Sequence, residues 1–167
     1  MALAALTTFH VLISLVGIAC GFIAVAGMMQ GKIAKLPNDW FLITTIGTSV
    51  TGYFFPVHQF LPSHALGILS LITLAVAALA YWGKRLQDRW TRTYAIAATV
   101  ALYFNVFVLV VQAFKHVPVL NQLAPKGAEP PFQISQLVVL LLFIVIGIRA
   151  VKGVKKGSAP AARAASV

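Results

Sequence analysis

The chain has 167 residues, of which 60% are hydrophobic and 10% are charged, and its formal net charge is +10. Average soluble domains are about 45–50% apolar and about 25% charged, so a water-soluble chain of this composition would lack the polar side chains that cover a core. The composition excludes an ordinary soluble domain and predicts that most of the chain lies in lipid.

Five long apolar runs follow one another along the chain. They cover residues 4–29, 40–57, 65–82, 93–114 and 132–150. A transmembrane helix needs about 20 predominantly apolar residues, and a continuous run in lipid satisfies its backbone groups by forming a helix. The second run is the shortest and the richest in threonine and serine. The pattern predicts an all-α integral membrane bundle of five transmembrane helices over residues 1–151.

The positions of the Lys and Arg residues predict the orientation, because cytoplasmic loops of membrane proteins carry an excess of them. Eleven of the thirteen fall in the segments 30–39, 83–92 and 149–167. The other two, Lys115 and Lys126, fall between the fourth and fifth runs or at their ends. We therefore expect a multi-pass protein of the bacterial inner membrane, with its N-terminus outside and its C-terminus in the cytoplasm.

Residues 152–167, after the fifth run, are rich in Ala, Gly, Ser and Lys and show no apolar periodicity. Such a composition is typical of a disordered segment, so we expect a basic, disordered cytoplasmic tail. Basic loops also lie against anionic lipid headgroups. The net charge therefore indicates the lipid bilayer as the partner, and the lack of a basic, folded reading surface argues against nucleic acid.

The sequence contains no motif that indicates catalysis. Cys20 is the single cysteine and has no CxxC partner, and no phosphate-binding glycine loop or hydrolase motif occurs. The acidic residues Asp39, Asp88 and Glu129 lie in loops or at the ends of runs, whereas proton relays and ion-coupled transporters generally use carboxylates within spans. An intrinsic catalytic activity is therefore not indicated.

The four histidines are the candidate metal ligands. They are His10, His58, His64 and His116, and all four fall on the predicted outer side. Imidazole groups with at most one carboxylate suit Zn, Cu(II) or Fe, including haem iron with axial histidines. The candidate ligands of an outer site are therefore one of these metals or a single haem.

Helical spacing predicts that His10 faces the interior of the bundle. It is followed by Ser14, Gly17 and Gly21 at offsets of four, seven and eleven residues, which places all of them on one stripe of a helix. Gly17 and Gly21 form a GxxxG motif, which allows another helix to approach closely. We therefore expect His10 on a packing face near the outer end of the first helix.

The fourth run carries a comparable stripe of polar side chains. Asn105, Gln112 and His116 lie at offsets of seven and eleven residues, and an unpaired amide in mid-membrane is costly, so this stripe should also face the bundle. Gln136 lies near the outer end of the fifth run. These residues and His10 form the predicted binding site for a haem or a quinone, with His10 and His116 as neighbours.

Two other interpretations remain open. The polar side chains can act as hydrogen-bonding contacts between helices, each a modest contribution, in a non-catalytic accessory subunit that packs against a larger membrane complex or a second copy of the chain. Alternatively, the hydroxyl-rich second run can line the path of a small-solute permease.

The five-span layout is similar in outline to small haem-bearing membrane anchors of respiratory enzymes, which would imply a role in electron transport. Those anchors carry pairs of histidines on two spans, one pair per side of the membrane. This chain has no histidine on the predicted cytoplasmic side, so no residue role is carried over. The sequence therefore predicts a small membrane protein that binds a metal, haem or quinone in or alongside a larger membrane complex.

Overall fold

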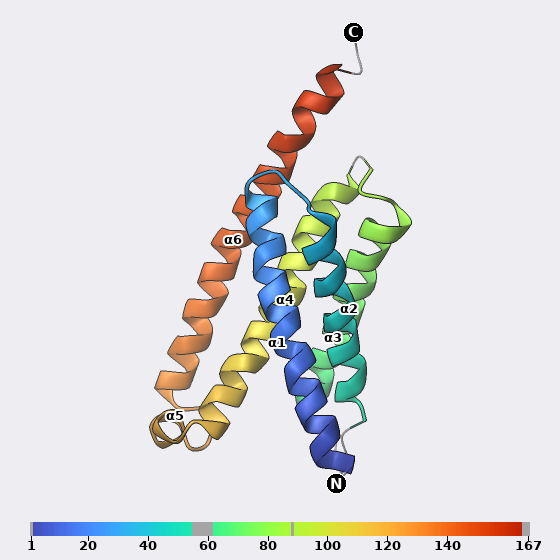
Figure 1. Cartoon of the computed structure of the whole chain (residues 1–167). Helices are drawn as coiled ribbons and strands as arrows, with labels where there is room; N and C mark the ends of the chain where they lie inside the picture. The colour runs from blue at the N-terminus through green and yellow to red at the C-terminus, as the bar shows by residue number, and fades with distance from the viewer. Residues whose placement is uncertain (1, 55–61, 88, 165–167) are drawn as a thin grey trace.

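The computed structural model describes residues 2–54, 62–87 and 89–164, and within these ranges the secondary structure is entirely helical (Figure 1). The elements are α1 (Ala2–Met29), α2 (Lys35–Gly52), α3 (Pro62–Ala78), η1 (Leu79–Gly83), α4 (Trp90–His116), α5 (Pro118–Leu123) and α6 (Pro130–Ala164). The single π-helical turn η1 continues α3 directly. The prediction of an all-α chain is confirmed for the described residues.

Four helical segments among the described residues are long and apolar enough to cross a membrane. They are Ala4–Met29, Ala65–Gly83, Trp90–His116 and Pro130–Gly157. They correspond to the first, third, fourth and fifth apolar runs of the sequence, and the helices extend beyond most of the predicted ends. The described part of the chain is therefore all-helical, with four candidate transmembrane helices.

The second predicted span, residues 40–57, differs most from the structure. The helix in this region, α2, begins at Lys35 and ends at Gly52, and residues 55–57 lie outside the described part of the chain. With its 18 residues and several hydroxyl side chains, α2 is not among the four candidate spans. It nevertheless lies beside α1 along much of the bundle (Figure 1) and packs against α1 more extensively than any other pair of helices does.

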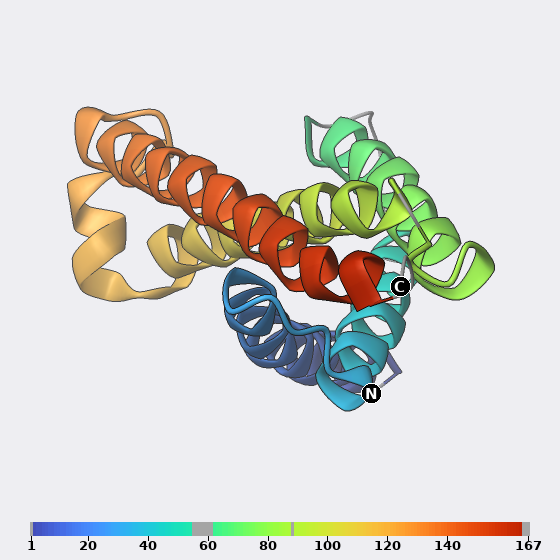
Figure 2. The ribbon, with the colours of Figure 1, turned by 90° about the horizontal axis from the view of Figure 1, so that it is seen from above.

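Helix α4 lies at the centre of the bundle and packs against α1, α3, α5 and α6. Seen from above, α6 lies along one side over α4, while α2 and α3 lie together on the other (Figure 2). The face of α4 that α1 and its neighbours cover is rich in alanine, with Ala95, Ala98 and Ala101 fully buried beside Leu102. Such small residues allow helix backbones to approach closely.

The GxxxG motif of α1 lies in this interior, as predicted. A Cβ atom added at Gly21 would lie 2.6 Å from Leu102 Cδ1 and 2.8 Å from Phe41 Cδ2. One added at Gly17 would lie 2.9 Å from Thr44 Oγ1. The absence of side chains at both glycines therefore lets α2 and α4 contact the backbone of α1.

The segment 152–164, where we expected a disordered tail, instead continues α6 as far as Ala164. Its first two turns pack on the end of α1: Val154 is buried, and Gly153 lies against the carbonyl oxygens of Met28 and Met29. Gly157 lies in the same way against Gly31. Two glycines one turn apart allow this close crossing, which apolar periodicity alone does not reveal.

The connections gather at the two ends of the bundle (Figure 1). One end holds the turn after α1, the turn between η1 and α4, and the C-terminal part of α6. The other end holds the start of α1, the end of α2, the start of α3, and α5. The two sets of segments that differ in basic residues thus lie at opposite ends.

Candidate functional site

Polar side chains line the contact of α2 with α1 and α4. We call this set the polar seam, and it comprises His10, Ser14, Asn38, Thr45, Thr48, Thr51, Tyr94 and Asn105. On α2, positions 38, 45, 48 and 51 recur close to the period of a helix, so they share one face. The local sequence of α2 therefore presents its polar side chains to neighbouring helices.

His10 lies at the outermost part of the seam and bonds to α2. Its Nδ1 atom is 2.9 Å from Thr51 Oγ1. The Thr51 hydroxyl also lies 2.8 Å from the carbonyl of Gly47, so it joins His10 to the backbone of α2. Ser14 Oγ, one turn further along α1, donates to the His10 carbonyl at 2.6 Å and lies 3.3 Å from Thr48 Oγ1.

Asn105 occupies the middle of the seam. Its Nδ2 donates to Thr45 Oγ1 on α2 at 3.2 Å, and the Thr45 side chain is fully buried. An amide at this depth has no water to bond to, so a partner on another helix is the way to satisfy it. The prediction that Asn105 faces the bundle is confirmed by this contact.

Tyr94 and Asn38 form the buried inner end of the seam. The Tyr94 hydroxyl donates to Asn38 Oδ1 at 2.6 Å, and Asn38 Nδ2 donates to the Ala34 carbonyl at 2.6 Å. Both side chains are fully buried. The sequence interpretation missed this pair, because Asn38 precedes the predicted span. Its spacing of seven residues from Thr45 is the signal that could have placed it on the same face.

Next to Asn38 in the chain, Asp39 joins the start of α2 to η1 by a side-chain hydrogen bond. It accepts hydrogen bonds from Lys35 Nζ at 2.6 Å and Trp82 Nε1 at 3.1 Å. These two bonds stabilise the carboxylate, the one from Lys35 most, and hold the pKa of Asp39 below its usual value. The acidic group therefore contributes to attaching α2 to η1.

The other predicted site residues lie elsewhere. Gln112 and His116 are exposed on α4. Gln136 is buried on α6, and its Nε2 donates to the Phe107 carbonyl at 3.2 Å. His58 lies outside the described residues, and His64 belongs to the first turn of α3. Of the five residues proposed to hold a haem or quinone, only His10 and Asn105 belong to the seam.

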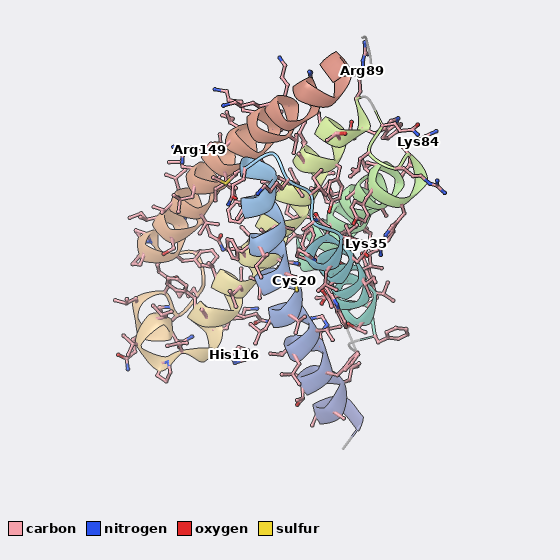
Figure 3. All side chains as sticks on the ribbon, turned by 45° about the horizontal axis from the view of Figure 1, so that its top comes forward. Cys20, Lys35, Lys84, Arg89, His116 and Arg149 are labelled. Atoms are coloured by element: carbon pink, nitrogen blue, oxygen red, sulfur yellow. The ribbon has the colours of Figure 1, made fainter. Side chains whose placement is uncertain are left out.

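The structure does not bring His10 and His116 together. His10 bonds to α2, whereas His116 ends α4 beside α5, on the side of the bundle away from the start of α1 (Figures 1 and 3). In the described part of the chain, no group of three or more His, Cys, Asp or Glu side chains could hold a metal ion. Metal or haem binding by the histidines stays a prediction without a shared site.

Glu129, a carboxylate between α5 and the start of α6, is bonded within its own loop. Its side chain accepts hydrogen bonds from the backbone N–H groups of Lys126 at 2.9 Å and Ala128 at 3.0 Å. These bonds stabilise the carboxylate and lower the pKa of Glu129. The group therefore orders the turn before α6.

Comparison of the chain with protein-family models, curated proteins and solved structures finds no match. Function is therefore inferred from the chemistry of the described residues. Within the seam, imidazole, hydroxyl and amide groups bond to one another or to helix carbonyls across α1, α2 and α4. This arrangement holds helices together, since its donors and acceptors are directed at neighbouring helices.

Proposed function

We propose that the chain crosses a bacterial inner membrane five times, with its N-terminus outside and its C-terminus in the cytoplasm. The proposal makes α2 the additional span. Its 18 residues extend about 27 Å at about 1.5 Å per residue, close to the hydrocarbon thickness of about 30 Å. Its polar face is turned to α1 and α4, so lipid meets mainly its apolar side chains. The position of the basic segments at one end of the bundle supports the orientation.

Reporter fusions test this topology. A reporter fused after Val167 should show a cytoplasmic location, and one inserted beside Lys126 should show an outer location. A reporter in the 30–34 turn should also show a cytoplasmic location. An outward C-terminus would contradict the orientation, and an outward 30–34 turn with a cytoplasmic C-terminus would show that α2 does not cross.

Within this bundle, we propose that the protein acts as a non-catalytic accessory subunit that packs against a larger membrane complex. The hydrogen-bonded polar seam carries this proposal, because two of the side chains that suggested a binding site, His10 and Asn105, are engaged in contacts between helices. Two faces remain for a partner: many large apolar side chains of α1 and α6 are exposed, and only 11% of the span in α6 is buried. Such an apolar surface suits either lipid or another membrane protein.

Binding of a metal, a haem or a quinone is the competing proposal, and one purification decides between the two. The full chain is isolated in mild detergent, and its absorption spectrum, metal content and organic extract are measured. The accessory role predicts no haem band and no metal or quinone at one per chain. A stoichiometric ligand that is lost in His10→Ala or His116→Ala, but retained in the seam variant Thr45→Val, would overturn the accessory role.

A photo-crosslinking amino acid tests the partner directly. Placed at Leu142 on the exposed face of α6, it should yield one discrete adduct with another membrane protein in living cells. The matched position is Val154, which is buried against the bundle and should yield contacts within the chain only. An absence of any protein adduct from exposed positions on both α1 and α6 would contradict the accessory role.

A further inference from the structure

A groove runs between α4 and α6, on the side of α4 away from α2. It has a volume of about 490 Å³, within the range of about 300–1,000 Å³ that ligand pockets occupy. Ile96 and Tyr103 line its α4 wall, and Leu140, Ile144 and Gly147 line its α6 wall. Because almost all of the lining is apolar, a ligand in the groove must present hydrocarbon to it.

A basic hollow adjoins the inner end of this groove. It has a volume of about 380 Å³ and is lined by Arg149, Lys152 and Lys156 together with Met29 and Gly153. Lys152 lines both spaces, so the groove and the hollow meet at this side chain. The three cations lie three and four residues apart on α6 and share one face.

The charge of this hollow has no internal counterpart in the described part of the chain. Among the described residues, the ion pair joins Lys35 and Asp39 at 2.6 Å, away from the hollow. No carboxylate lines the groove or the hollow. Figure 3 shows Arg149 on the opposite side of the bundle from Lys84. Three positive groups at the end of an apolar groove therefore complement a ligand that carries an anionic group on a hydrocarbon chain.

The length of the groove matches one leaflet of a bilayer. From Leu140 to Lys152 the α6 wall rises about 18 Å at about 1.5 Å per residue, and half of the hydrocarbon core is about 15 Å thick. The basic hollow then falls at the depth of the headgroups. Lys and Arg between helices at this depth are suited to the phosphate of a lipid.

We propose that the groove and the basic hollow form one binding site for an anionic phospholipid of the leaflet at the C-terminal end of α6. An acyl chain lies between α4 and α6, and the lipid phosphate contacts Arg149, Lys152 and Lys156. The site rests on the membrane-spanning bundle but not on the accessory role, which can fail without affecting it.

Native mass spectrometry of the full chain in detergent tests the headgroup part. The protein is titrated with phosphatidylglycerol and with phosphatidylcholine that carries the same acyl chains. We expect selective binding of phosphatidylglycerol, which weakens about fivefold for each charge removed and about 25-fold in the double variant Arg149→Gln, Lys152→Gln. The matched control is Lys32→Gln, Lys155→Gln, which removes two exposed charges that do not line the hollow and should retain the wild-type affinity.

A second pair of variants tests the acyl-chain part. Ile144→Trp should fill the groove and weaken phosphatidylglycerol binding with all cations intact, whereas Leu142→Trp, on another exposed face of α6, should not. Both positions are exposed, so both variants should unfold at the wild-type temperature. If Arg149→Gln, Lys152→Gln and the control Lys32→Gln, Lys155→Gln lost phosphatidylglycerol affinity equally, the binding would be a general surface attraction, and the proposed site would be overturned. Competition by inorganic phosphate, with no effect of Ile144→Trp, would show an anion site only and overturn it as well.

Discussion

The contact between α1 and α2 and the contact between α4 and α6 join helices in opposite ways. Between α1 and α2, glycines bring the backbones together and hydroxyl, imidazole and amide groups bond across the contact. Between α4 and α6, aromatic rings pack across the contact, as in the pairs Tyr103–Phe143 at 5.7 Å and Phe114–Phe132 at 5.4 Å between ring centroids. Tyr103 and Phe143 also line the groove.

The comparison shows why the seam and the groove suit different roles. A contact with small residues and directed hydrogen bonds defines one register between two helices, because a shift unpairs several polar groups together. The contact of α4 with α6 combines rings and aliphatic side chains with the hydrogen bond from Gln136 to the Phe107 carbonyl, so fewer directed bonds define its register. The seam is therefore expected to hold the bundle in one arrangement, and the groove is available for lipid.

The largest expected effect comes from filling the space at the GxxxG motif. Gly21→Ala should lower the free energy of unfolding by about 1–3 kcal/mol, because overpacking forces well-packed neighbours to shift, and both Leu102 and Phe41 would lie within 3.0 Å of the new atom. Gly147→Ala is the matched change in α6, where the new atom would lie 3.5 Å from Thr99 Cγ2 and should be nearly neutral. Denaturant titration in detergent measures both. Equal values would abolish the contrast between the two contacts.

Gly31, which lies in a turn, is not a suitable control for such substitutions. Its φ angle is +77°, and its Cβ would lie 3.0 Å from the Gly153 carbonyl oxygen. A side chain at this position would strain the backbone, because non-glycine residues rarely adopt a positive φ. It would also contact α6 where that helix packs over the end of α1. A substitution at this turn position therefore disturbs a helix contact as well as the turn.

A second prediction contrasts two buried polar side chains. Tyr94→Phe should destabilise the protein by about 1–3 kcal/mol, because it leaves the Oδ1 atom of the buried Asn38 without its donor. Gln136→Leu should cost less, since it loses the 3.2 Å bond from Nε2 to the Phe107 carbonyl but also removes the Oε1 atom, which in the described structure is buried without a partner. The same titration measures both variants. Destabilisation by Gln136→Leu as large as that by Tyr94→Phe would show that the α4–α6 contact also depends on directed bonds.

The smallest expected effect is the pH dependence at the start of α2. Since the pKa of Asp39 is lowered in the folded state, its contribution to stability is complete above the ordinary carboxyl pKa and is lost as the pH falls through the lowered one. Trp82 donates to this carboxylate, so its fluorescence should change over that acidic range in a variant with Trp40 and Trp90 replaced by Phe. The change should be absent when Asp39→Asn is added. A transition that persists in that variant would assign it to another group.

Several features followed from the sequence because their causes are local. Continuous apolar runs predict helices, since lipid and the interior both require the backbone to bond within itself, and the four candidate spans agree with four of the runs. The spacing of His10, Gly17 and Gly21 placed them on a face that contacts α2 or α4. Asn105 was placed in the interior for the same reason, and its bond to Thr45 agrees.

The relations between distant helices depended on the tertiary structure. Helical spacing gives the face on which His116 lies but not the neighbour of that face, and in the structure His116 ends α4 on the side away from the start of α1 (Figure 3). The pairing of Tyr94 with Asn38, and the crossing of Gly153 over Met28, likewise join segments far apart in the chain. Periodicity along one helix is set by local geometry, whereas partner choice depends on packing shape and bond direction summed over the whole bundle.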